Sequence, residues 1–278
     1  MLVAGRHFLP DVDPDKLGHK TLAVNLSDMA AMGATPRWAL LAGALPDLDA
    51  SWLAGFARGF YALADRHAID LVGGDTTRGP LNLCVTVLGE VPTGLALTRG
   101  GARAGDDVYV SGALGDAALA LAALTGRVTL HSDALAAARE RLETPTPRIA
   151  LGIALRGVAT AALDVSDGLT GDLGHILEQS GVGARIELAA VPRSQALARL
   201  LAGAQRSLAL EWLLAGGDDY ELCFTAPRAA ARRVAAIASE TGVALTRIGE
   251  IVANKGLVVC DEHGAALPAL PRAFDHFA

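Results

Sequence analysis

The sequence contains few lysines, cysteines and aromatic residues, and each shortage excludes a class of protein. Its 278 residues include three lysines, three cysteines and 4% aromatics. Cys84, Cys223 and Cys260 lie far apart in apolar runs, which argues against a disulfide framework or a zinc site and predicts core positions. No apolar stretch reaches the roughly 20 residues that a membrane helix needs, and the first residues carry no secretory signal. We therefore expect a cytoplasmic protein with no membrane partner.

Common catalytic motifs are absent as well. The sequence has no Walker-type Gly-x-x-x-x-Gly-Lys-Ser/Thr, no Gly-x-Ser-x-Gly and no His-Glu-x-x-His, which excludes a P-loop nucleotide site and the common hydrolase and zinc-protease classes. The formal net charge is −6, and no basic stripe is present to bind a phosphate backbone, so we expect no nucleic-acid partner.

Aspartate is abundant and outnumbers glutamate by 20 to 10. Much of it lies beside Gly, Ser or Thr, where short carboxylates suit a hard cation such as Mg²⁺. Aspartate is also a common turn and cap residue, so this composition alone leaves both interpretations open.

The apolar spacing predicts an α/β or α+β fold with two domains. A helix is expected over 13–33, with Asp13 as N-cap and Pro14 at the first helical position, and a second helix over 49–67. The glycine-rich stretch 93–107 is the expected linker, which gives domains 1–98 and 99–278. Further strands are predicted over 38–45, 69–72, 81–91, 108–110, 161–165, 184–188, 220–225, 244–251 and 257–260. Further helices are predicted over 116–124, 132–142, 148–156, 168–179, 193–202 and 229–241.

Four acidic segments stand out within this frame: 25–28, 73–79, 164–168 and 216–221. In the segment 73–79 an Asp follows two glycines after an apolar strand, so backbone N–H groups of a loop are free to approach a phosphate. A simple tight turn is the alternative. Thr76, Thr77 and Arg78 add hydrogen-bond donors to this segment.

The segments around Asp28 and Asp167 are also candidates for anion and metal chemistry. Asp164 and Asp167 flank Ser166 at a predicted helix N-terminus, which favours phosphates and their metals; a helix cap is the alternative role for Asp167. Asp28 lies inside a predicted apolar helix, where its carboxylate needs either an arginine or a metal. Carboxylates, glycines and a few arginines together favour Mg²⁺-dependent chemistry on phosphates.

The order and spacing of these segments resemble those of the thiamine-monophosphate kinases over essentially the whole chain. The sequences around 25–36 and 164–168 are shared with the wider aminoimidazole ribonucleotide synthetase superfamily. Gly-Gly-Asp-Thr-Thr-Arg-Gly-Pro at 73–80, Gly-Gly-Asp-Asp-Tyr-Glu-Leu at 216–222 and Phe-Asp-His-Phe at 274–277 are more particular to the kinases.

The resemblance implies direct in-line transfer of the γ-phosphoryl group of ATP to thiamine monophosphate, with several Mg²⁺ ions. The acceptor is already anionic, so no side chain needs to remove a proton, but cations must bring two polyanions together. The implied metal ligands are Asp28, Asp75, Asp164 and Asp167, and the implied catalytic residues are Asp28, Asp75 and Asp167. The implied ATP contacts are Gly74, Asp75, Arg99 and Ser166, and the implied contacts to thiamine phosphate are His7, Asp218 and Phe274.

The family also implies a homodimer in which two N-terminal domains form a central barrel, with a C-terminal α/β domain over the nucleotide cleft. Phe274 stands where Trp or Tyr is common, which keeps an aromatic face for the thiazolium but a weaker one. Two other functions remain open: an amidine-forming, ATP-dependent synthetase of the same superfamily, and a dimer that binds thiamine phosphate or nucleotide without turnover.

Family members begin earlier than this chain, with an acidic Gly-Asp-Asp-like segment and a strand that leads into the residues aligned with 1–8. We therefore expect that the sequence starts at an internal Met and lacks several Mg²⁺ ligands. Metal binding and catalysis by this form are expected to be weak compared with a form that is extended upstream.

Overall fold

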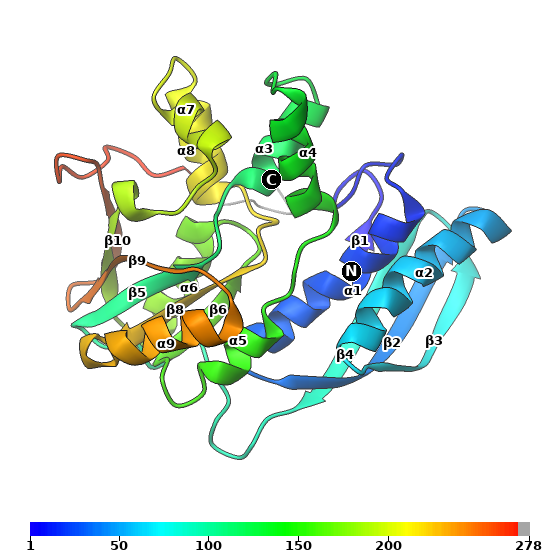
Figure 1. Ribbon diagram of the computed structural model, residues 1–278, viewed down its shortest axis with the longest axis horizontal. Coiled ribbons are helices and arrows are strands. Elements are labelled where there is room, and N and C mark those ends of the chain that lie inside the picture. Colours follow the sequence, from blue (N-terminus) through cyan, green and yellow to red (C-terminus); the bar gives the residue numbers. More distant parts are fainter. Residues whose placement is uncertain (272–278) are drawn as a thin grey trace.

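The computed structural model of the protein describes residues 1–271 and contains two α/β lobes, each built on one sheet. Figure 1 shows the smaller sheet at the lower right, with two helices over one of its faces, and the larger sheet on the left. A long helix of the first lobe runs between the two sheets. The mixed α/β fold with two lobes is as expected from the sequence.

The first lobe contains a four-stranded sheet in the order β1-β4-β2-β3. Strand β2 pairs in parallel with β3 and antiparallel with β4, and β1 adds to β4 in antiparallel orientation. The sheet ends in β1 and β3 and does not close within this chain. The elements are β1 (Leu2–Val3), α1 (Pro14–Ala31), β2 (Thr35–Leu45), α2 (Ala50–Arg66), β3 (Asp70–Arg78) and β4 (Asn82–Glu90).

The second lobe contains a six-stranded sheet in the order β10-β7-β9-β5-β8-β6, in which only β10 and β7 pair in parallel within residues 1–271. Its strands are β5 (Asp106–Ser111), β6 (Ala161–Val165), β7 (Gly183–Glu187), β8 (Glu221–Pro227), β9 (Leu245–Val252) and β10 (Gly256–Cys260). Its helices are α3 (Asp116–Leu124), α4 (Ser132–Glu143), α5 (Ile149–Ala154), α6 (Leu169–Ser180), α7 (Gln195–Leu201), α8 (Arg206–Ala215) and α9 (Ala231–Thr241), with the short 3₁₀ turns Leu188–Ala190 and Arg228–Ala230.

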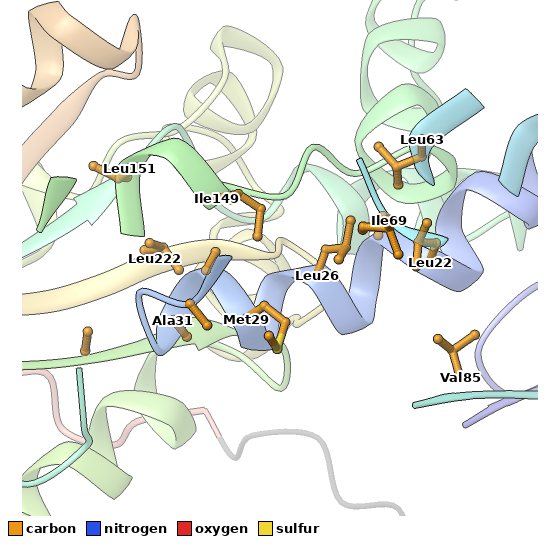
Figure 2. Close-up of a cluster of buried hydrophobic side chains, with 14 of the residues drawn as sticks. Leu22, Leu26, Met29, Ala31, Leu63, Ile69, Val85, Ile149, Leu151 and Leu222 are labelled. Carbon is orange, nitrogen blue, oxygen red and sulfur yellow. The ribbon is translucent and has the colours of Figure 1, made fainter. Parts of the chain in front are cut away.

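Helix α1 joins the two lobes. Asp13 caps it by accepting a hydrogen bond from the backbone N–H of Asp15, and Pro14 occupies its first turn, as the sequence predicted. Figure 2 shows its apolar side chains in one core with both lobes: Leu63, Ile69 and Val85 come from the first, and Ile149, Leu151 and Leu222 from the second.

Glycines let α1 lie close to its neighbours. A Cβ atom at Gly18 would lie 2.0 Å from the carbonyl oxygen of Phe56 in α2, and one at Gly152 of α5 would lie 1.9 Å from that of Ala30. Any larger residue would push these helices apart, so the two glycines fix α1 between α2 and α5.

Several predicted elements differ from the structure. The segment 73–79 was expected as a loop after a short strand, but it continues β3 as far as Arg78, because β3 pairs with β2 along Trp38–Leu45. The apolar spacing predicts neither α8 nor the short β1. Cys223 and Cys260 are buried as expected, whereas Cys84 is only half-buried.

The region expected as the linker, 93–107, lies largely between β4 and β5. The domain limits 1–98 and 99–278 remain a prediction, since the core around α1 contains side chains from both lobes. Within residues 1–271, the structure contains no helix that is both long enough and apolar enough to cross a membrane.

Candidate active site

A cavity of about 310 Å³ lies between the lobes and collects most of the residues singled out in the sequence. His7 and Asp28 line it from the first lobe. The second lobe contributes Asp164, Ser166, Asp167 and Asp218. Segments that are as far apart in the sequence as His7 and Asp218 therefore meet at one place.

Asp28 points its carboxylate into this cavity from α1. Its side chain is exposed although Ser27 and Met29 on either side are buried. Partial desolvation by the cavity walls raises the pKa of Asp28, and the nearby charge of Arg99 opposes that rise. An arginine is one of the two partners that the sequence leaves open for Asp28; Arg99 interacts with it electrostatically, and the carboxylate also remains accessible to a cation.

Arg99 lines a second cavity, of about 270 Å³, together with both Asp28 and Asp164. Asp28 and Asp164 thus border both cavities, the main one and the one that Arg99 lines. A guanidinium in this position is suited to a phosphate chain that passes the carboxylates.

Asp164 lies at the end of β6 and is buried. Burial, and next the charge of Asp28, raise its pKa to about 7. Two carboxylates that repel each other in a partly desolvated place are stabilised by a cation between them.

The loop 166–168 is shaped by Asp172, a buried residue in the first turn of α6. Its Oδ2 accepts hydrogen bonds from the backbone N–H groups of Ser166, Asp167 and Gly168, each at 3.0 Å. Burial raises the pKa of Asp172 to about 6 in spite of these bonds. Sequence reasoning missed this residue, although an acid in the first helical turn is a recognisable signal.

Asp218 borders the cavity from the second lobe, in a loop with an unusual backbone. Gly217, Asp218 and Tyr220 all have positive φ, at 69°, 60° and 49°. The Asp218 carboxylate accepts hydrogen bonds from Lys20 Nζ at 2.8 Å and from the Tyr220 hydroxyl at 2.9 Å. Its backbone N–H donates to the Ser166 carbonyl at 2.8 Å, which ties the two acidic loops together.

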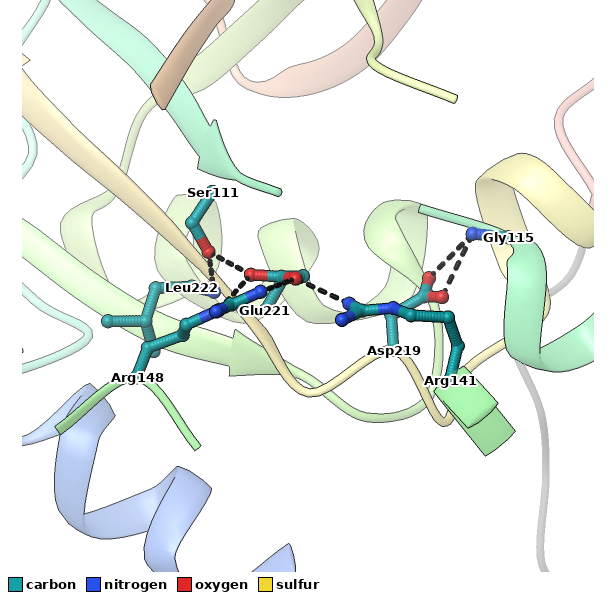
Figure 3. Close-up of polar contacts among 7 residues, drawn as sticks. All are labelled: Ser111, Gly115, Arg141, Arg148, Asp219, Glu221 and Leu222. Atoms are coloured by element: carbon teal, nitrogen blue, oxygen red, sulfur yellow. Dashed lines mark hydrogen bonds and ion pairs between the residues drawn. The ribbon is translucent and has the colours of Figure 1, made fainter. Parts of the chain in front are cut away.

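The two other acids of this segment are buried and have structural partners (Figure 3). Asp219 accepts the backbone N–H of Gly115 at 2.9 Å, at the start of α3, where the N-cap residue Gly115 has no side chain to form a cap. Glu221 pairs with Arg141 and Arg148, both at 2.5 Å, and accepts the Ser111 hydroxyl. Within residues 216–221, the side chain of Asp218 is thus the acid that reaches the cavity.

The structure does not bring Gly74 and Asp75 to this cavity. Both lie on β3, and the Asp75 carboxylate is exposed and accepts the N–H of Thr76 at 2.8 Å. Gly74 has φ of 150°, and a Cβ there would lie 1.8 Å from the Leu41 carbonyl oxygen, so the sheet itself requires glycine. Phe274 lies outside the described residues, so its expected role stays a prediction.

The donor set suits Mg²⁺ without forming a complete protein cage. Residues 1–271 contain no group of three or more His, Cys, Asp or Glu side chains arranged to hold a metal ion. Mg²⁺ is ordinarily held by one or two carboxylates together with substrate phosphates and water. Asp28 and Asp164, with Asp167 on the same cavity, fit that kind of site.

Comparison with protein families identifies the class. Residues 1–91 match the N-terminal domain of the AIR synthase related proteins, and residues 103–261 match their C-terminal domain. The chain therefore belongs to the AIR synthase related proteins, whose two-domain fold it has.

Individual relatives narrow the family further. The chain is 46% identical to the thiamine-monophosphate kinase of Salmonella typhimurium over its full length, which covers 85% of that protein. The crystal structure of the thiamine-monophosphate kinase from Stenotrophomonas maltophilia is 48% identical, with a TM-score of 0.88 over 96% of this chain and 84% of that one. The protein in the structure of AaThiL complexed with AMPPCP and TMP is 32% identical to this chain. The two structures superpose with a TM-score of 0.84 over 99% of this chain and 85% of that one. Within the AIR synthase related proteins, this chain belongs to the thiamine-monophosphate kinase family.

Proposed function

We propose that this protein transfers the γ-phosphoryl group of ATP to the phosphate of thiamine monophosphate, which yields thiamine diphosphate and ADP. The observation that carries the proposal is the cavity between the lobes, which is lined by the exposed carboxylate of Asp28 in α1, the buried carboxylate of Asp164 in β6, and Asp218. Membership of the kinase family supports it, as does the AaThiL complex with AMPPCP, an ATP analogue, and TMP.

The residues of the cavity suit a reaction between two phosphates. The attacking oxygen is already anionic, so the site needs no general base. Asp28, Asp164 and Asp167 would hold Mg²⁺, which when bound supplies the positive charge that lets two polyanions approach each other. These carboxylates bind and orient, and the lobes on either side exclude bulk water from the reacting groups.

Donor and acceptor take opposite ends of the site in this proposal. Arg99 and Ser166 contact ATP phosphates, since Arg99 lies beyond the carboxylates and Ser166 is at the N-terminus of α6. His7 and Asp218 hold thiamine phosphate at the other end, with the aromatic ring of Phe274 against the thiazolium. In the described region His7 Nδ1 accepts the N–H of Val3 at 3.0 Å, which fixes the orientation of its ring.

The exposed apolar face of the first sheet and the position of Asp75 support a homodimer. Trp38, Leu40 and Leu88 lie on the face of the first sheet away from α1 and α2 and are 42%, 38% and 46% exposed. Asp75 lies opposite Ala42 on the same sheet and does not line the carboxylate-lined cavity of its own chain. We infer a cytoplasmic homodimer through this face, in which Gly74 and Asp75 contribute to nucleotide and metal binding in the site of the partner subunit.

The central test is an assay of purified protein with ATP, Mg²⁺ and thiamine monophosphate. We expect ADP and thiamine diphosphate in equal amounts, no free phosphate, and no product when EDTA removes the metal. Free phosphate released with a formylglycinamide-type substrate, and no thiamine diphosphate, would establish the amidine-forming synthetase instead. Saturable binding of both ligands with no product would establish a protein that binds without turnover.

Subunit mixing tests the dimer. Asp75→Asn and Asp28→Asn proteins are each expected to be inactive. If Asp75 acts across the interface, a mixed dimer of the two variants contains one site with both wild-type acids. Exchange of subunits should then restore about a quarter of the wild-type activity, which is the statistical share of intact sites. No recovery in verified mixed dimers would place Asp75 in the site of its own chain.

A further inference from the structure

Lys20 is a buried lysine that the proposed chemistry does not use. It lies in α1, its side chain is 3% exposed, and its Nζ contacts Asp218 Oδ2 at 2.8 Å. The contact joins residues that are 198 positions apart and belong to different lobes. Burial of an ammonium group costs free energy unless the group is paired, so the pairing with Asp218 is what stabilises Lys20 in this position.

Asp218 needs such a partner, because its backbone conformation is unfavourable for a residue with a Cβ. Its φ of 60° and the 49° of Tyr220 lie in the left-handed region, where the Cβ crowds the following carbonyl oxygen. The Lys20 ammonium and the Tyr220 hydroxyl bind one oxygen each of the carboxylate. These two bonds determine where the carboxylate points.

Lys20 is itself held firmly against the second lobe. Three polar side chains on one side of α1 contact that lobe: Lys16 pairs with Glu143 at 2.6 Å, His19 Nε2 lies 2.8 Å from the Pro145 carbonyl oxygen, and Lys20 pairs with Asp218. The spacing of three and four residues puts them on adjacent turns of the same helix face. The ammonium therefore has a fixed position relative to the second lobe.

Asp218 stands where two cavities meet. Besides the carboxylate-lined cavity it borders a more apolar one of about 260 Å³, whose walls include Phe8, Leu9, Val12, Leu124 and Leu142. Lys20 lines the apolar cavity but not the carboxylate-lined one, whereas Asp28 lines the carboxylate-lined cavity but not the apolar one. Arg99 lines neither of these two, but borders the cavity of about 270 Å³ that it shares with Asp28 and Asp164. The Lys20–Asp218 pair and Arg99 thus border different cavities.

We propose that Lys20 is a positioning residue for the acceptor: it holds the Asp218 carboxylate at the junction of the two cavities and so sets the affinity for thiamine monophosphate, but not for ATP. This inference rests on the proposed function and adds to it a residue that acts through Asp218. Lys20 supplies charge and geometry, and the reacting phosphates are bound elsewhere in the site.

The test compares Lys20→Met, Lys20→Arg and Lys255→Met, the last a matched change at an exposed lysine in the turn before β10. Calorimetry measures the Kd of thiamine monophosphate and of AMPPCP, and kinetics measures KM for both substrates. Lys20→Met should weaken thiamine monophosphate binding by roughly 10- to 100-fold, the usual loss when a group that orients another is removed. AMPPCP affinity should stay within about twofold, Lys20→Arg should retain part of the acceptor affinity because it keeps the charge, and Lys255→Met should match the wild type.

A double-mutant cycle shows whether Lys20 acts through Asp218. Adding Lys20→Met to Asp218→Asn should weaken acceptor binding by no more than about twofold beyond Asp218→Asn alone, because the orienting function is already lost. This comparison also decides the matter if Lys20→Met alone does not fold, since the double variant leaves no unpaired charge. Additive losses, or equal losses for thiamine monophosphate and AMPPCP, would overturn the inference.

The outcomes separate this inference from the proposed function. A wild-type protein that neither binds thiamine monophosphate nor forms thiamine diphosphate would contradict the proposed function itself. A wild-type protein that binds it, beside a folded Lys20→Met variant that binds it equally well, would contradict only the role of Lys20.

Discussion

The tripeptide Gly-Gly-Asp occurs twice in this chain, at 73–75 and at 216–218, with two different structures. In the first, the residues are part of β3, and the carboxylate is exposed on the sheet. In the second, they lie in an irregular loop with positive φ at Gly217 and Asp218, and the carboxylate is held by Lys20 and Tyr220. The same tripeptide therefore forms a strand or a loop according to the partners that the rest of the chain provides.

The two segments also differ in how many partners their carboxylates find within one chain. Each acid of 218–221 has a partner from another element of the same subunit, in α1, in the turn before α3, or around α4 and α5. Among residues 1–271, Asp75 has one hydrogen-bond partner, the backbone N–H of its neighbour Thr76. Where a carboxylate already has its partners, its position is set by folding, and where it has none, its role depends on a second molecule or a ligand.

The largest effect is expected at Glu221, which holds the second segment in place. Glu221→Gln removes the buried charge that pairs with the half-buried Arg141 and Arg148, so the free energy of unfolding should fall by about 3–5 kcal/mol. Urea denaturation measures it. Glu240→Gln is the control, because that glutamate is 53% exposed in its pair with Arg233 and its loss should cost below about 1 kcal/mol. Equal losses in the two variants would contradict the structural role of Glu221.

Next in size is the effect of Asp75→Asn on turnover. An amide keeps the volume but removes the charge of a metal ligand, so kcat/KM should fall by about 100-fold or more. The stability should change by less than about 0.5 kcal/mol, because the side chain is exposed. Asp70→Asn, an equally exposed site on the same strand, should leave both quantities unchanged. Full activity of Asp75→Asn would remove Asp75 from the metal site.

The smallest effect concerns the glycines of the two segments. Gly217→Ala places a Cβ at positive φ, 2.5 Å from the Ser166 carbonyl oxygen, and should lower the free energy of unfolding by about 1–2 kcal/mol. Gly73→Ala meets only the end of the flexible Leu40 side chain at 3.2 Å and should change stability by less than about 1 kcal/mol in either direction. Thermal unfolding of both proteins measures the difference, and a larger loss for Gly73→Ala would reverse this comparison.

Much of the fold follows from local signals. Asp13 caps α1 as predicted, and Asp49 caps α2 at the start of the predicted helix 49–67, because a cap needs only a short acceptor at the right place in the sequence. Strand β6 has the predicted bounds, since a short apolar run ends there at Ser166. The meeting of Asp28, Asp164, Asp167 and Asp218 at one cavity agrees with the grouping that the family resemblance implied.

Other features lie beyond local signals. The segment 73–79 becomes a strand only because β2 is available to pair with it. The contact between Lys20 and Asp218 depends on how α1 packs against the second lobe, which no local pattern contains. Asp172 looks like an ordinary helix acid, and its three backbone partners become evident only when the loop is folded around it.

Helix α1 carries both Lys20 and Asp28, eight positions apart along one continuous helix. At a rise of 1.5 Å per residue, these positions are separated by about 12 Å along the helix axis. Lys20, which holds the acceptor loop, and Asp28, which interacts with Arg99, therefore lie at a fixed separation on one rigid helix. A change in the angle between the lobes would widen or narrow the cavity around the substrates, but it would leave the span between these two points unchanged.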